Sequence, residues 1–257
     1  MNEWVYNAQL FALVIVRVTS FFYNMPIFGG QFIPNTIKIT ASVGIALIIF
    51  PLVPRAVIPA EAPYMMDFAL FVFKEFLVGF TTGFMVSIFI LGIRFSGILI
   101  GQNMGLMMAN VVDPESNEQV SILEQIHYFV FLFVFLSLNG HLTIVKAIVD
   151  SYSLIPAGGF SFHSDIIIII VNSLSNMFTI GFNIAMPVFG TLMIVTVLLG
   201  FIAKVAQKIQ VMLLSFPLKI VVGIIILTIA FPVMMELFFD TFDQIKTEMY
   251  KIMQAMY

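Results

Sequence analysis

Apolar stretches with few or no charges dominate the chain, and short polar segments separate them. Because a membrane-spanning helix needs about 20 mostly apolar residues, several stretches are long enough to cross a bilayer. The pattern predicts six or seven apolar segments. They lie within residues 4–37 (interrupted only by Arg17), 39–54, 68–112, 126–145, 166–203 and 220–235, and a helical tail of mixed charge follows over 236–257.

The run 166–203 is too long for a simple span. As one helix it would extend about 57 Å, whereas the hydrocarbon core of a bilayer is about 30 Å thick. Either the polar residues at 172–176 break the run, or its helix continues beyond the bilayer inside a protein assembly.

Composition narrows the class of protein. Apolar residues make up 61% and charged residues 10% of the 257 residues, against about 45–50% and 25% in soluble domains. We therefore expect an all-α membrane protein forming one membrane-embedded unit over 1–257. The net charge of −3 without a basic patch argues against nucleic acid as a partner.

No arrangement of residues predicts catalysis. His127, His141 and His163 lack the spacing of metal ligands, the chain has no cysteine, and no glycine-rich phosphate loop is present. We expect no enzyme, cofactor or metal.

Small residues recur every four positions along one helix face. Such stripes let two backbones approach closely, either within the chain or against a partner. The members are Gly79 and Gly83, followed by Gly97, Gly101, Gly105 and Ala109.

Four charges fall inside predicted spans: Arg17, Lys74, Glu75 and Arg94. Each costs on the order of 3 kcal/mol when it faces lipid in mid-helix. They must pair, reach the membrane surface, or line a watery path, and the sequence does not assign their partners.

A basic segment lies between the last two apolar runs. Lys204, Lys208 and Lys219 occur there without an acidic residue, and positive loops favour the cytoplasmic side. The tail 236–257 is then expected on the opposite side.

The segment 101–116 is unusual because it is rich in Gly and Met and runs into Asp113-Pro114. Met104, Met107 and Met108 share a helix face, and Pro114 disfavours helix at the residue before it. On spacing alone, a core helix followed by a loop explains the segment.

Several motifs occur in the order typical of one family. The chain resembles the FliR/SctT family of type III secretion export gates from about residue 17 to 235. The matching motifs are Arg17-Val18, Pro26-Ile-Phe-Gly29, Lys74-Glu-Phe-Leu-Val-Gly79, residues 101–114, Asn139-Gly-His141, Asp150-Ser-Tyr152 and Pro156. Residues 207–219 resemble the hairpin turn of FliQ, although Val211 and Phe216 replace more polar residues.

The resemblance implies kinked helical hairpins, with a FliP-like part over about 1–165 joined to a FliQ-like hairpin over about 166–247. It implies a core subunit of the flagellar export gate, in the bacterial inner membrane at the flagellar basal body. The implied partners are FliP-like, FliQ-like and FlhB-like subunits and the unfolded flagellar proteins that are exported.

The resemblance also implies a pore plug at about 105–119. A compliant apolar seal suits a pore that passes many unrelated sequences, and Met provides one. We expect Met107, Met108, Val111 and Val112 to form the seal and Asp113-Pro114 to fix its turn. The expected plug residues are Gly105, Met107, Met108, Asn110, Val111, Val112, Asp113 and Pro114.

Three alternatives remain at the level of sequence. One is an SctT-like injectisome subunit, and another is a scaffold without a pore. The third is a small secondary transporter, which would need an inverted repeat and broken helices in both halves. Residues 26–30 and 187–190 are the candidate breaks, but no matching symmetry is visible.

Overall fold

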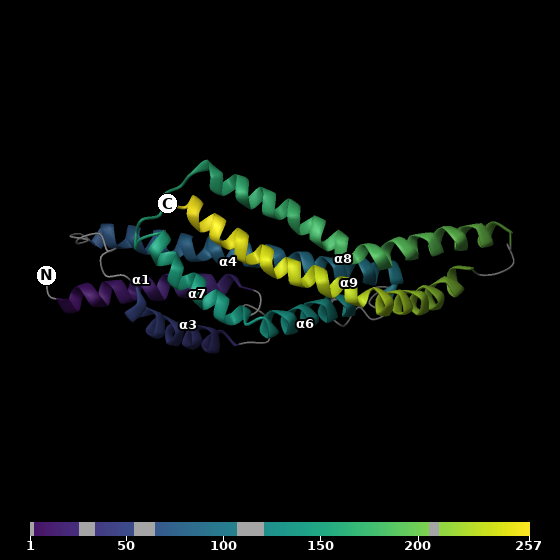
Figure 1. The fold of residues 1–257 in the computed structure, drawn as a ribbon, viewed down its shortest axis with the longest axis horizontal. Helices are drawn as coiled ribbons and strands as arrows, with labels where there is room; N and C mark the ends of the chain where they lie inside the picture. Colours follow the sequence, from purple (N-terminus) through teal and green to yellow (C-terminus); the bar gives the residue numbers. More distant parts are fainter. Residues whose placement is uncertain (1–2, 26–33, 54–64, 107–120, 206–210) are drawn as a thin grey trace. The chain divides into compact units, whose positions relative to one another are not determined.

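The computed structural model describes residues 3–25, 34–53, 65–106, 121–205 and 211–257. Within these ranges every regular element is a helix, which confirms the predicted all-α class (Figure 1). The elements are α1 (Glu3–Asn24), α3 (Asn35–Ile49), the short 3-10 helix η1 (Phe50–Leu52), α4 (Met65–Met104), α6 (Ile122–Ser137), α7 (Gly140–Leu154), α8 (Ser164–Val205) and α9 (Val211–Ala255).

Among the described residues, four helices are long and apolar enough to cross a membrane, namely α1, α4, α8 and α9. The bent pair α6 and α7 adds a fifth span if it crosses as one, with an angle of 68° between the two helices. Asn139 lies at this bend in the left-handed conformation, with a φ of 55°. These spans are fewer than the six or seven predicted apolar segments. The difference arises because α3 is too short to count as a span, while the last apolar run and the tail form the single helix α9.

Helix α8 is continuous over its 42 residues, so of the two alternatives for this run the break at 172–176 does not occur. Its length is about 63 Å at 1.5 Å per residue, about twice the hydrocarbon thickness. Pro187 lies inside the helix without ending it.

Helix α9 extends over 45 residues and contains Pro217 and Pro232. In the most apolar 18-residue stretch of α9 only 17% is buried inside the structure. The corresponding shares are 28% for α8 and 67% for α4. The two longest helices therefore present apolar side chains that the other described residues do not cover.

The chain forms two compact units. Unit 1 comprises residues 1–88, 136–174 and 243–257. Its core contains the apolar face of α1, where Leu10, Val14, Val18 and Phe21 recur at helical spacing and are buried. The last turns of α9 belong to the same unit, and the backbone N–H of Ser161 donates to the Met256 carbonyl at 2.9 Å.

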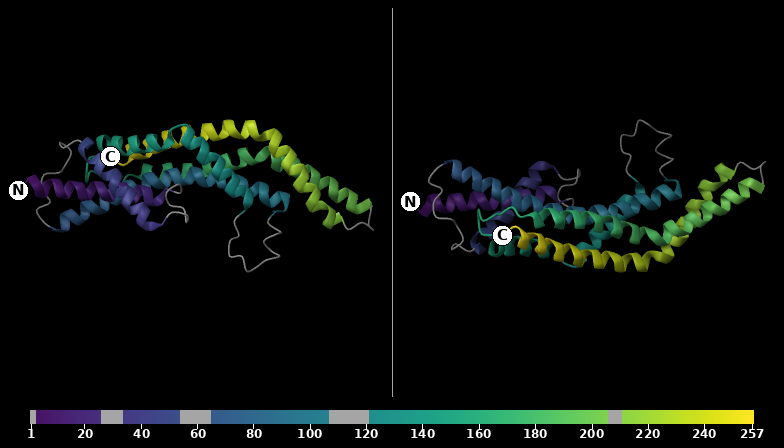
Figure 2. Two further views of the ribbon diagram at one scale, coloured as in Figure 1. Left: turned by 90° about the horizontal axis from the view of Figure 1, so that it is seen from below. Right: turned by 90° about the horizontal axis from the view of Figure 1, so that it is seen from above.

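Unit 2 comprises residues 89–135 and 175–242. In it the second half of α8 and the first half of α9 lie side by side in both views of Figure 2. Aromatic side chains join α6 to α9: the ring centroids of Phe131 and Phe238 are 6.1 Å apart, and those of Phe135 and Phe242 are 5.7 Å apart.

Candidate functional site

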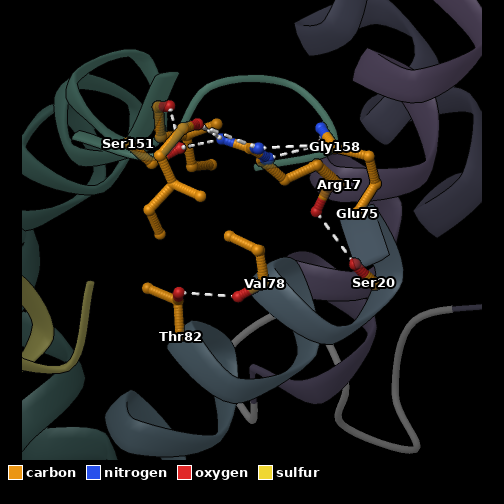
Figure 3. Close-up of polar contacts among 9 residues, drawn as sticks. Arg17, Ser20, Glu75, Val78, Thr82, Ser151 and Gly158 are labelled. Atoms are coloured by element: carbon orange, nitrogen blue, oxygen red, sulfur yellow. Dashed lines mark hydrogen bonds and ion pairs between the residues drawn. The ribbon is translucent and has the colours of Figure 1, made fainter. Parts of the chain in front are cut away.

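A buried ion pair joins α1 to α4 in unit 1. The Arg17 Nε donates to Glu75 Oε2 at 2.6 Å, and its Nη2 donates to Oε1 at 2.9 Å (Figure 3). Both side chains are almost completely buried, with 2% and 1% exposed. The two parallel hydrogen bonds match the flat guanidinium to the carboxylate, which is the strongest geometry for such a pair.

The rest of the guanidinium is also occupied, and it reaches the end of α7. Its Nη1 donates to the Ser151 hydroxyl at 3.1 Å, and both terminal nitrogens donate to the Ile155 carbonyl at 3.2 Å. The guanidinium carbon lies 3.9 Å from the centre of the Tyr152 ring, which adds a cation–π contact. Arg17 therefore links three helices through one planar group.

Lys74 and Glu75 together hold one glycine of the turn that follows α7. The Gly158 N–H donates to Glu75 Oε1 at 2.8 Å, while Lys74 Nζ donates to the Gly158 carbonyl at 3.2 Å. Gly158 has a φ of 75°, and a Cβ there would lie 2.5 Å from the Phe71 ring. The N–H and the carbonyl of Gly158 thus both obtain hydrogen bonds from side chains of α4.

Two of the predicted small residues let α1 approach α4 closely. A Cβ on Gly79 would overlap the Arg17 carbonyl and the Ser20 hydroxyl, and one on Gly83 would lie 2.5 Å from the Phe21 carbonyl. These neighbours are mainly backbone atoms, which cannot move aside as a flexible side chain can.

Within unit 2, Gly97 and Gly101 face the start of α6. A Cβ on Gly97 would lie 2.5 Å from the Leu123 carbonyl, and one on Gly101 would overlap the Ser121 hydroxyl. Ala109 lies outside the described residues.

Arg94 forms a separate ion pair in unit 2. Its Nη2 lies 2.7 Å from Glu124 Oε1, with 36% and 12% of the two side chains exposed. Its guanidinium carbon is 5.6 Å from the Tyr128 ring centre. All four predicted intramembrane charges thus have partners in the structure: Arg17 and Glu75 with each other, Lys74 with backbone, and Arg94 with Glu124.

Sequence reasoning missed the groups that complete these clusters. Ser151, Tyr152 and the Ile155 carbonyl surround Arg17, and Glu124 pairs with Arg94. The only signal for them was the Asp150-Ser-Tyr152 motif, which carried the resemblance but suggested no partner. Sequence reasoning also missed the buried contact between His127 Nδ1 and Ser96 Oγ, at 2.7 Å.

Of the predicted plug residues, Gly105 alone is described. It follows the last residue of α4, has a φ of 79°, and donates its N–H to the Gln102 carbonyl at 3.1 Å. The other members lie outside the described residues: Met107, Met108, Asn110, Val111, Val112, Asp113 and Pro114.

The basic segment is partly described. Lys204 is exposed at the end of α8, and Lys219 is half-buried near the start of α9. Lys208 lies between the two helices, outside the described residues.

Comparison with known proteins extends over most of the chain. The model of the family "Bacterial export proteins, family 1" matches residues 8–245. The flagellar biosynthetic protein FliR of Bacillus subtilis strain 168 is 29% identical, over 82% of this chain and 82% of its own length.

Two further relatives have the same name. FliR of Escherichia coli strain K12 is 26% identical over 82% of this chain and 79% of its own length. FliR of Aquifex aeolicus strain VF5 is 24% identical over 76% of this chain and 74% of its own length. These matches confirm the resemblance that the ordered motifs indicated. A single family model thus includes all four intramembrane charges and both compact units for most of their length, and the chain belongs to the bacterial export proteins, family 1.

Proposed function

We propose that the chain is the FliR-type core subunit of the flagellar type III protein export gate, in the bacterial inner membrane at the flagellar basal body. The observation that carries the proposal is the family match over residues 8–245, together with FliR relatives that align over about four fifths of their length. On this proposal the chain acts by forming part of a channel and not by catalysing a reaction.

The uncovered apolar surface supports an assembly with other membrane subunits. Helices α8 and α9 contain 42 and 45 residues, so each is about 60 Å long or more. The bilayer can cover only about 30 Å of that length. FliP-like and FliQ-like subunits would cover the remainder, and an FlhB-like subunit would meet the basic segment on the cytoplasmic side. The division into a FliP-like part over about 1–165 and a FliQ-like hairpin over about 166–247 belongs to the same proposal.

The pore plug is part of the proposal. Residues 105–119 would lie across the channel, with Met107, Met108, Val111 and Val112 as the seal. Soft apolar side chains can exclude water and ions while still yielding to many different substrates. Unfolded flagellar proteins would displace this short segment as they enter.

Deleting residues 110–117 tests the plug. The complex should still assemble, because the contacts of units 1 and 2 described above involve other residues. The membrane should become permeable to ions and small solutes, which bilayer conductance would measure. A deletion variant that assembles and stays as tight as wild type would place the seal elsewhere.

One of the two helix breaks expected for a secondary transporter, at residues 187–190, is absent from helix α8. Helix α8 passes through Pro187 and Gly190 without interruption, whereas a transporter of the inverted-repeat type needs discontinuous helices in both halves.

Deleting the gene in its own bacterium tests the function. Flagellar proteins should disappear from the culture medium, motility should be lost, and a plasmid-borne copy should restore both. The tagged chain should co-purify with small membrane proteins in mild detergent. Intact motility combined with loss of injected effector proteins would instead support the SctT-like alternative.

A further inference from the structure

One side of α8 in unit 2 is exposed and polar but carries no charge. We call this side the polar stripe, and its members are Ser175, Asn176, Thr179 and Asn183. Residues four apart lie one above the other on a helix, so Ser175, Thr179 and Asn183 form a row with Asn176 beside it. All four residues are exposed.

The described part of the chain leaves most of the hydrogen-bonding groups of the stripe unused. The Thr179 hydroxyl donates to the Ser175 carbonyl at 3.3 Å. The Ser175 hydroxyl and the side-chain amides of Asn176 and Asn183 form no hydrogen bond with another described residue. Three neighbouring side chains that can donate and accept hydrogen bonds therefore point away from the protein's own helices.

The opposite side of α8 packs against α4 of the same chain. A Cβ on Gly181 would lie 2.8 Å from the Gly92 carbonyl, and one on Gly92 would lie 2.8 Å from the Met177 carbonyl. These close backbone contacts fix the orientation of α8 about its own axis in unit 2. They leave the polar stripe on the outside.

An apolar edge runs beside the stripe. Phe178 and Phe182 each contact Phe95 of α4, with ring centroids 5.5 and 5.9 Å apart. The two rings are nevertheless 50% and 43% exposed. The outer surface of this part of α8 thus combines hydrogen-bonding side chains with exposed phenyl rings.

Neither lipid nor water satisfies both parts of this surface. Lipid would leave the amides without hydrogen-bond partners. Water would satisfy the amides but leave the phenyl rings exposed. A water-facing helix is also expected to carry charges, since about a quarter of the residues in soluble domains are charged, whereas residues 166–203 include none.

Another stretch of α8 is better suited to lipid. The exposed side chains of residues 186–205 are apolar apart from Thr196 and Lys204. The Thr196 hydroxyl donates to the Leu192 carbonyl at 2.7 Å, and Lys204 lies at the end of the helix. This stretch is about 30 Å long, which matches the hydrocarbon thickness of a bilayer. The polar stripe then lies on the remainder of α8, beyond the hydrocarbon.

We propose that the polar stripe is a docking surface for a helix of another membrane subunit, which presents uncharged hydrogen-bonding side chains flanked by apolar ones. Such a helix satisfies the amides and covers the phenyl rings at the same time. The partner's side chains are uncharged, because a charge buried against this stripe would find no counter-charge. The inference rests on the proposed function, since it needs the subunits of the assembly.

Substitution by leucine and by aspartate distinguishes the three surroundings. Asn176→Leu combined with Asn183→Leu should reduce the co-purifying subunits several-fold, because leucine cannot form hydrogen bonds. Asn176→Asp combined with Asn183→Asp should also reduce them, because docking would bury the new charges. A stripe that faces lipid would tolerate leucine but not aspartate, and one that faces water would tolerate both. Either of these results would overturn the inference.

Thr196→Leu is the matched control. It introduces the same side chain at an exposed position of the same helix, within the stretch assigned to lipid. The co-purifying subunits should remain at the wild-type level. Because all the substituted side chains are exposed, each variant chain should keep its helical content, which circular dichroism measures.

Photo-cross-linking tests the contact without relying on the loss of a complex. A photo-reactive residue introduced at position 176 of the assembled complex should cross-link to a co-purifying subunit, which mass spectrometry of the purified product identifies. The same residue at position 197, where Val197 is 57% exposed in the apolar stretch, should give far less cross-linked protein. Equal yields at the two positions, or no protein product at position 176, would contradict the docking surface.

The outcomes separate this inference from the proposed function. If the wild-type chain purifies without other subunits and its gene is dispensable for flagellar export, the proposed function fails and the inference fails with it. If export requires the gene and the wild-type complex forms, yet the leucine and aspartate variants retain every subunit, the docking surface alone is wrong.

Discussion

At the scale of single residues, the chain places its buried charges where several elements meet. Arg17 has a carboxylate, a hydroxyl, a carbonyl and an aromatic ring around it. A guanidinium can satisfy all of these at once because it is planar and has five N–H donors. The positions of the four intramembrane charges could be predicted from the sequence, because a charge stands out in an apolar run. Their partners could not, since Glu75 lies 58 residues and Ile155 lies 138 residues from Arg17.

Removing one side of this pair should be costly. Glu75→Gln keeps the size of the side chain but leaves the Arg17 charge buried without its counter-charge, which costs about 3–5 kcal/mol. We expect a clear fall in the thermal stability of the purified complex. Arg94→Gln is the comparison, because its pair with Glu124 is less buried than the pair of Arg17 with Glu75, so its loss should lower the melting temperature by less. Equal melting temperatures for the two variants would contradict this interpretation.

At the scale of helices, glycine residues allow two helix backbones to pack in close contact. The four-residue spacing of small residues identified the faces that pack, but it did not tell which element each face would meet. Gly79 and Gly83 meet α1, while Gly97 and Gly101 meet the start of α6. The sequence also left open whether 166–203 would break. It does not, because Asn172, Ser175 and Asn176 are exposed on a helix whose backbone hydrogen bonds continue past them.

A pair of alanine substitutions tests this packing. Gly83→Ala should destabilise the complex, because the added methyl group meets backbone atoms of Phe21. Gly190→Ala should be neutral or stabilising by up to about 1 kcal/mol, because Ala favours helix over Gly and nothing lies within 4 Å of a Cβ at that position. Thermal unfolding of the two variants measures the difference. A Gly83 variant as stable as wild type would show that α1 and α4 can separate at little cost.

At the scale of the whole molecule, the class and the family could be predicted, whereas the two compact units could not. Each unit draws on segments far apart in the chain, and hydrophobic periodicity reports only local structure. The assignment of membrane sides likewise depends on the short segment 206–210, which lies outside the described residues. Residues 206–210 join two long helices, and the far ends of these helices meet again where Ser161 binds the Met256 carbonyl.

Cysteine labelling tests the orientation, and the chain has no cysteine of its own. Lys208→Cys should react with a membrane-impermeant thiol reagent only from the cytoplasmic face. Tyr257→Cys, at a position that is 68% exposed, should react only from the opposite face, because in the proposed hairpin α9 would return across the membrane. Labelling of both sites from one side would rule out a hairpin that crosses it.

The composition of unit 1 has a consequence for biosynthesis. Its core includes Met249, Ile252 and Met253 from α9, which are at most 1% exposed, together with residues of α1. The ribosome makes the α1 part of this core long before the α9 part. While the intervening helices enter the membrane, α1 and α4 can already join Arg17 to Glu75, but the pocket around the pair stays open until α7 arrives. The final turns of α9 then complete the packing. Unit 1 therefore matures only after residues 243–257 have been made, and a ribosome that stops shortly before residue 243 would release a chain in which the core of unit 1 still lacks Met249, Ile252 and Met253.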